Sequence, residues 1–160
     1  MNWKFSVLAI GVLIFLGCNN INQTEILKND IEEKALFVLS QKSKDLKNNK
    51  DTFLSYINNS RKVLPEEPYD KSKALLDFME AKVNYSEKIN ENDAMLFLKS
   101  LRLLEKNPEN NLPFLIDGYY QVSYFYIFEN PYYITANSYM AKSVFYANLY
   151  TGNDTLVQKK

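Results

Sequence analysis

The chain has 160 residues, a formal net charge of zero, a single cysteine and no histidine. These counts exclude nucleophilic catalysis assisted by histidine, an internal disulfide, and metal sites built from histidine or from cysteine clusters. The balanced charge argues against DNA or RNA as a partner, because such partners require an excess of lysine and arginine. The length predicts one domain. The sequence contains neither a glycine-rich phosphate-binding loop nor the spacing of a set of metal ligands, so we expect no cofactor and no metal.

The N-terminus has the pattern of an export signal. A short segment with one lysine, Lys4, precedes an apolar run over residues 5–16. This run is shorter than the roughly 20 residues that span a bilayer, but it fits the hydrophobic part of a signal peptide. The run ends in Phe15-Leu16-Gly17-Cys18, which resembles the lipobox of bacterial lipoproteins, with Phe15 where that family usually has leucine.

The resemblance implies that residues 1–17 are removed as a signal peptide and that Cys18 carries acyl chains inserted into membrane lipid. Residues 18–23 would then form the lipidated end and a short tether. Asn19 follows the cysteine, whereas aspartate at that position favours the inner membrane of enteric bacteria. We therefore expect a lipid-anchored protein of the bacterial cell envelope, in the outer membrane rather than the inner one. Its domain would lie in the periplasm or at the cell surface.

Four amphipathic helices are expected first, because apolar residues recur at the spacing of one helical face. They cover residues 24–47, 51–64, 70–89 and 92–107. Asp51 suits the N-cap of the second helix, and Asn92 or Asp93 suits that of the fourth. The residues expected to face the core are Leu27, Ile31, Ala35, Val38, Leu39, Phe53, Leu54, Ile57, Leu64, Leu75, Phe78, Met79, Val83, Ala94, Phe97, Leu98, Leu101 and Leu104.

The segment over residues 113–129 is ambiguous. Its β-branched and aromatic residues favour a strand, whereas the spacing of Leu115, Tyr119 and Val122 fits one face of a helix. Pro113 suits a first helical turn, and a lone strand would lack a partner, so we prefer a helix. A last helix is expected over residues 131–150.

The predicted fold is therefore all-α, with six helices in antiparallel hairpins that form a bundle or an irregular stack. The hairpins resemble tetratricopeptide repeats, but their spacing of about 43 residues differs from the 34 of that family. Residues 24–152 would form a single domain. The helix-stopping run from Thr151 to Asp154 would separate that domain from a tail over residues 153–160.

The composition of the domain is uneven. Between Leu112 and Tyr150 there are three charged residues, whereas nine of the 12 tyrosines of the chain lie there. In one interpretation these two helices are the central core, covered by the amphipathic helices before them. In the other, part of the tyrosine-rich face binds a partner, because tyrosine is enriched at interfaces. The candidate partner-binding residues are Tyr119, Tyr120, Tyr124, Tyr126, Tyr132, Tyr133 and Tyr139.

Carboxylates are the remaining candidates for catalysis. The pairs Glu32-Glu33, Glu66-Glu67 and Asp77-Glu80 are expected on solvated helix faces, with Lys73 pairing with Asp77 or Glu80. Asp117 and Glu129 lie in apolar sequence, where desolvation would raise a carboxyl pKa. Both also have plain roles, Asp117 as a cap or a solvent-facing residue and Glu129 as the end of its helix. We therefore do not expect an enzyme.

The sequence favours a membrane-anchored, non-catalytic binding or accessory module whose partner is an envelope protein or peptide. The alternative is an immunity-type lipoprotein that neutralises a toxin. An enzyme acting on an envelope polymer is the least favoured function.

Overall fold

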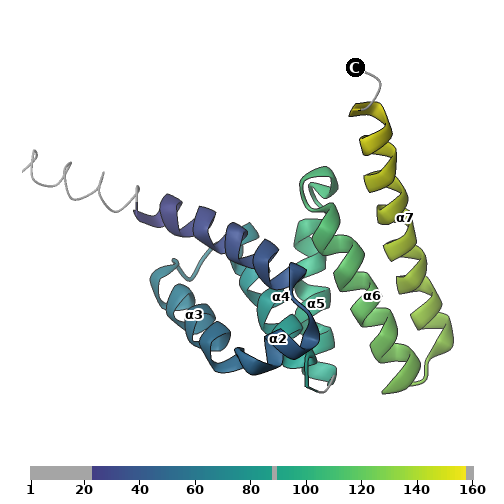
Figure 1. Cartoon of the computed structure of the whole chain (residues 1–160), viewed down its shortest axis with the longest axis horizontal. Coiled ribbons are helices and arrows are strands. Elements are labelled where there is room, and N and C mark those ends of the chain that lie inside the picture. The colour runs from purple at the N-terminus through teal and green to yellow at the C-terminus, as the bar shows by residue number, and fades with distance from the viewer. Residues whose placement is uncertain (1–22, 88–89, 158–160) are drawn as a thin grey trace, which may run out of the picture.

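Figure 1 shows the computed structural model of the chain, which describes residues 23–87 and 90–157. The predicted signal peptide and Cys18 lie outside the described residues. The described part consists of seven α-helices and a short 3-10 turn, η1 (Pro108–Asn110), and contains no strand. This confirms the predicted all-α fold and the helix over residues 113–129. In chain order, the helices are residues 23–40, α2 (Ser43–Asn48), α3 (Lys50–Val63), α4 (Lys71–Tyr85), α5 (Glu91–Leu104), α6 (Leu112–Phe128) and α7 (Tyr133–Val157).

The first predicted helix is divided in two. The helix over residues 23–40 ends before Lys42, which has an extended backbone, and α2 follows. No apolar residue occurs between Leu39 and Leu46, so burial does not favour a continuous helix across this segment. The bend turns Leu46 into the core, where it is 2% exposed.

The helix starts differ from the predicted caps. The N-cap of α3 is Asn49 and that of α5 is Asn90, so the predicted caps at Asp51 and at Asn92 or Asp93 are wrong. The side chain of Asn90 accepts a hydrogen bond from the backbone N–H of Asp93. Asp51 and Asp93 instead lie in the first turns of their helices, where a negative charge interacts favourably with the helix dipole.

The last helix also ends later than predicted. α7 continues through Gly152 to Val157, so the predicted stop of the helix at residues 151–154 is wrong. Glycine in a helix costs about 1 kcal/mol relative to alanine, which weakens a helix without ending it. The Thr151 hydroxyl donates back to the carbonyl oxygens of Ala147 and Asn148 within the same helix.

The core is centred on α4, which packs against α2, α3 and α5. The predicted inward residues of α4 are fully buried, and those of α5 are buried as predicted. The ring of Phe78 contacts Phe97 of α5 and Phe114 of α6 edge-on, with centroids 5.1 and 5.3 Å apart. This aromatic cluster joins the three central helices.

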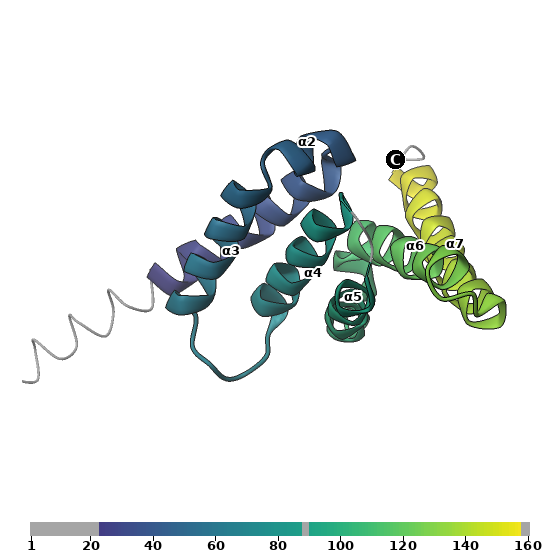
Figure 2. The ribbon, with the colours of Figure 1, turned by 90° about the horizontal axis from the view of Figure 1, so that it is seen from below.

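α7 lies at the outer edge of the molecule (Figure 2). α6 packs between α5 and α7, whereas α7 packs mainly on α6. The interpretation that places both tyrosine-rich helices at the centre of the core is therefore wrong for α7. Because one side of α7 is covered, many of its apolar side chains remain exposed.

Candidate binding surface on the last two helices

Tyr119 is a core residue rather than a surface one. Its side chain is 2% exposed, and its ring stacks on those of Tyr139 and Tyr146, with centroids 5.9 and 6.0 Å apart. The Lys142 ammonium lies 4.6 Å from the centre of the Tyr119 ring and donates to its hydroxyl at 3.1 Å. Tyr119 is therefore inaccessible to a partner, which corrects its place among the candidate residues.

Tyr126 and Tyr139 join the two helices of the last hairpin. Both are half-buried, and their rings stack with centroids 5.7 Å apart. Each is packed against the core. Their arrangement gives them a structural role in holding α7 on α6 and leaves only part of each ring accessible.

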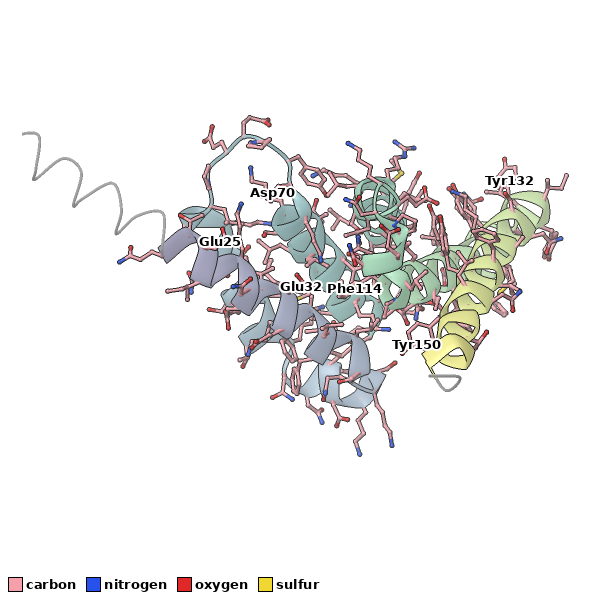
Figure 3. All side chains as sticks on the ribbon, turned by 90° about the horizontal axis from the view of Figure 1, so that it is seen from above. Glu25, Glu32, Asp70, Phe114, Tyr132 and Tyr150 are labelled. Atoms are coloured by element: carbon pink, nitrogen blue, oxygen red, sulfur yellow. The ribbon has the colours of Figure 1, made fainter. Side chains whose placement is uncertain are left out.

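The other four candidate tyrosines are exposed and form two groups. Tyr120 and Tyr124, 46% and 40% exposed, lie one helical turn apart on α6. Tyr132 and Tyr133, both 64% exposed, lie at the turn between α6 and α7. Figure 3 shows Tyr132 at the far end of the hairpin, distant from the central Phe114.

Tyr120 and Tyr124 line a cleft of about 280 Å³ between α2, α4 and α6. Tyr85 forms part of its wall, with its ring centroid 6.2 Å from that of Tyr124 in an edge-on contact. Phe128 extends this aromatic row along α6, with its centroid 4.3 Å from that of Tyr124. Tyr85 is not among the predicted residues, because nothing in its local sequence pattern shows that the end of α4 meets α6.

An ion pair between a buried lysine and a half-buried aspartate lies beside this cleft. Lys82, which lines the cleft and is 9% exposed, contacts Asp117 Oδ1 at 2.6 Å. Gln121 donates to the same oxygen at 3.3 Å. Asp117 Oδ2 is buried and has no hydrogen-bond partner within the described part of the chain. Asp117 therefore lies within α6 rather than at a helix cap, and the charge of its half-buried carboxylate is balanced by Lys82.

Glu129 has the plain role considered for it, because it is the exposed C-cap residue of α6. Within residues 23–87 and 90–157, no cluster of acidic residues is arranged to hold a metal ion. The cleft thus combines aromatic walls with amide and hydroxyl groups from Gln41, Ser43 and Gln121. Such a surface is suited to binding by stacking and hydrogen bonding.

Further exposed apolar side chains lie on the last hairpin and were missed by the sequence analysis. Phe128 is 62% exposed, Ile134 89%, Val144 52% and Phe145 57%. Lys142 is the one charged residue between Tyr133 and Thr151. Its ammonium pairs with the Glu105 carboxylate at 2.8 Å. These two helices have apolar residues on nearly all sides. Their sequence therefore indicated more apolar surface than the fold can bury, but not which side stays exposed.

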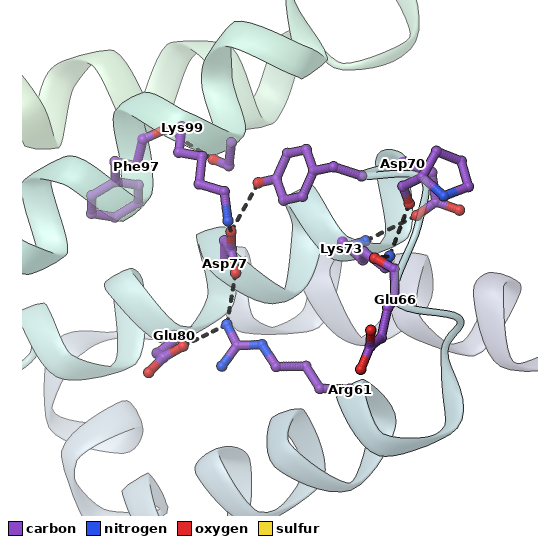
Figure 4. A network of polar contacts seen from close by, with 11 residues as sticks. Arg61, Glu66, Asp70, Lys73, Asp77, Glu80, Phe97 and Lys99 are labelled. Atoms are coloured by element: carbon purple, nitrogen blue, oxygen red, sulfur yellow. Dashed lines mark hydrogen bonds and ion pairs between the residues drawn. The ribbon is translucent and has the colours of Figure 1, made fainter.

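A second polar cluster, centred on Asp77, joins α3, α4 and α5 (Figure 4). Asp77 is buried and accepts hydrogen bonds from Arg61 at 2.7 Å, Tyr69 at 2.9 Å and Lys99 at 2.8 Å. Arg61 also pairs with Glu80. The prediction that Asp77 lies on a solvated face is therefore wrong. Because its partners come from neighbouring elements, the cluster fixes how those elements pack.

Lys73 does not pair with Asp77 or Glu80 as predicted. Its ammonium instead donates to the backbone carbonyls of Glu66 and Pro68 in the loop before α4. This loop borders a cleft of about 440 Å³ beside the Asp77 cluster. The polar groups of that cluster hydrogen-bond to one another and hold the neighbouring elements together.

Glu105, at the end of α5, pairs with Lys142 and Tyr146 of α7, so we expect the docking of α7 to depend on pH. Burial alone would raise the pKa of Glu105, but hydrogen bonds from Lys142, Tyr119 and Tyr146 outweigh it and hold the pKa below its usual range. A carboxyl with a lowered folded-state pKa stabilises the fold above its unfolded pKa, near 4.3, and this contribution is lost as the pH falls through the folded-state value.

Acidification below about pH 4 should therefore loosen α7, and hydrogen exchange of the α7 amides is expected to accelerate. Glu105→Gln should show faster exchange of the α7 amides already at pH 7, because the substitution weakens the docking of α7 by about 1–2 kcal/mol. It should also weaken the dependence of that exchange on pH between 5 and 3. An unchanged pH profile in Glu105→Gln would show that other groups control the docking of α7.

Comparisons with known proteins provide no relative: no family model, no curated protein and no solved structure matches this chain. No helix in the described part is both long and apolar enough to cross a membrane.

Proposed function

We propose that this protein is a bacterial envelope lipoprotein, anchored through acyl chains on Cys18, whose helical domain binds an envelope protein or peptide without catalysis. The observation that carries the proposal is the row of aromatic side chains beside the cleft on α6. Tyr120, Tyr124 and Phe128 are 46%, 40% and 62% exposed and lie on one side of one helix. Large exposed apolar patches on a soluble domain are typical of binding sites, and tyrosine is enriched at their energetic centres.

The cleft adds specificity to this aromatic row. Tyr85 provides a further ring, and Gln121 and Ser43 provide hydrogen-bonding groups at its border. An extended peptide or a loop of a partner can therefore place an apolar side chain against the rings while its backbone bonds to the polar groups. The compensated Lys82–Asp117 pair leaves the cleft without a free charge at its base, which suits an uncharged peptide segment.

The partner-binding proposal is tested by affinity capture from envelope extract with the double variant Tyr120→Ser/Tyr124→Ser. We expect the proteins captured by the wild type to be lost. The melting temperature should change by only about 1–2 °C, because both side chains are exposed. Phe37→Ser is the matched control, since Phe37 is 50% exposed but lies on the first helix, at residues 23–40. Capture that is equal for the double variant and the wild type would contradict the proposal.

The nature of the captured protein separates the two binding functions. A resident envelope protein supports an accessory module, whereas a foreign toxin supports the immunity-type alternative.

The lipid anchor has a separate test. Cells labelled with a clickable fatty acid should incorporate the label into the wild-type protein, and Cys18→Ser should abolish it, because Cys18 is the one cysteine of the chain. Stable anchoring requires two or more acyl chains, each buried CH₂ contributing about 0.8 kcal/mol. We therefore also expect the mature Cys18→Ser protein to be absent from the membrane fraction. A wild-type protein without label would refute the anchor.

A further inference from the structure

The outer face of α7 carries an uncharged stripe with no cover in the described part of the chain. α7 packs on α6 through the opposite side, where Ala136, Ser143 and Tyr146 are buried. The side chains of the outer face are all exposed. We call this face the α7 stripe, and its members are Ile134, Asn137, Ser138, Ala141, Val144, Phe145 and Asn148.

The stripe is unlike the outer face of a terminal helix that contacts water. Stacked helical hairpins normally end in a helix with a polar outer face, whereas Ile134, Val144 and Phe145 are 89%, 52% and 57% exposed. The exposed surface of α3, on the other side of the molecule (Figure 1), is polar apart from Val63 and includes Asp51 and Lys62. A further helix packed on the stripe would remove the apolar side chains from water.

The stripe is complementary to itself in an antiparallel arrangement. A two-fold axis beside Ala141 places Ile134 opposite Asn148 of the other copy, because the two positions lie seven residues on either side of Ala141. The same axis places Phe145 opposite Asn137 and Val144 opposite Ser138. Each pair sets a large apolar side chain against a polar side chain of smaller volume, so that the two surfaces can interlock like helices whose ridges fit into grooves.

Charge and size also favour a second copy. A two-fold axis brings equal charges together wherever an unpaired charged residue lies near it. The stripe contains no charged residue, and Lys142, the charged neighbour of Ala141, is paired with Glu105 and donates to Tyr119 of α6. Ile134, Val144 and Phe145 are more than half exposed, so the stripe offers a surface on the order of the 500 Å² per copy, about 1,000 Å² in total, that a specific interface needs.

We propose that this protein forms a homodimer through antiparallel packing of α7 against α7 of a second copy, with the two-fold axis beside Ala141. The cleft with Tyr120 and Tyr124 lies on the side of α6 that faces α2 and α4. It stays open in this dimer. The proposal is independent of the lipid anchor and of the partner bound in the cleft.

The test is cysteine cross-linking of the full chain in cells with a short bismaleimide. Ala141→Cys is expected to give a band at twice the mass of the chain. Wild type, which retains Cys18, and Asn58→Cys, on the exposed side of α3, are the controls and should give no such band. Absence of the band from Ala141→Cys, or a band at a different mass that reveals another protein on the stripe, would overturn the proposal.

The antiparallel register has its own readout. Asn137→Cys and Phe145→Cys should cross-link when two tagged copies carrying one substitution each are expressed together. Each variant alone should cross-link weakly, because identical positions then lie about 12 Å apart along the helix axis. Cross-linking of the single variants as efficient as that of the mixture would contradict the register.

A charge placed on the stripe provides the last control. Phe145→Glu in the Ala141→Cys background should abolish the dimer band while the circular dichroism spectrum stays helical, because Phe145 is exposed in the single chain. A dimer band that persists would show that contacts outside the stripe hold the two copies together, against the proposal.

Discussion

Replacing Gly118 by leucine is expected to lower the free energy of unfolding by about 3 kcal/mol. Gly118 lies in α6 where this helix meets the core. A Cβ atom at this position would lie 2.7 Å from Leu101 Cδ2 and 3.0 Å from Phe78 Cε2. Leu101 and Phe78 are both fully buried, so neither can move aside without disturbing the aromatic cluster between α4, α5 and α6.

Gly118→Ala should have a smaller effect of the same kind. Alanine gains about 1 kcal/mol of helix propensity over glycine, but it also introduces the Cβ contact, so we expect a net loss of about 1 kcal/mol. Chemical denaturation followed by far-UV circular dichroism measures both changes. Adding Leu101→Ala to Gly118→Leu should restore part of the stability, because it removes the atoms that clash. A Gly118→Leu variant as stable as the wild type would mean that α6 does not approach α5 this closely.

Asp77→Ala should lower the free energy of unfolding by about 2–4 kcal/mol. Removing one member of a buried ion pair typically costs about 3–5 kcal/mol, because the remaining charge loses its partner. The loss is expected to be smaller here, since the side chains of Arg61 and Lys99 are 33% and 55% exposed and water can hydrate them. Tyr69 also loses the acceptor of its hydroxyl.

Two variants separate the buried acceptor from its exposed partner. Lys99→Ala should cost less than about 1 kcal/mol, because its ion pair is largely solvated. Asp77→Asn keeps the size of the side chain but not its charge, and its effect should lie between those of Lys99→Ala and Asp77→Ala. Urea denaturation at pH 7 gives all three values. Equal losses for Lys99→Ala and Asp77→Ala would show that the burial of Asp77 is unimportant.

Both predictions concern positions whose importance the sequence did not show. The spacing of Asp77 and Glu80 is that of ordinary surface carboxylates, and a glycine next to Asp117 is compatible with a turn. Their roles depend on residues far away in the chain, such as Arg61 and Leu101, that only the packed fold brings into contact. Local sequence patterns carry no information about such contacts.

The sequence by itself determined the helices and, for the amphipathic ones, the buried face. The inward apolar residues of α5, from Ala94 to Leu104, and those of α4 are buried as predicted. The spacing of apolar residues in such helices marks the side that is removed from water. The helix ends were less well predicted, since a cap depends on a few polar residues that are interchangeable in sequence. The division of the first helix before Lys42 is the largest example.

The tertiary structure alone decided which tyrosines are core and which are surface. α6 and α7 are apolar nearly all round, so their sequence has no polar side to mark the solvent, and spacing cannot show which neighbour covers them. Tyr119 is buried because α6 packs between α5 and α7. Tyr120, the next residue, stays exposed at the cleft. The position of α7 at the edge leaves Ile134 and Phe145 exposed, because no other described helix is placed to cover that side.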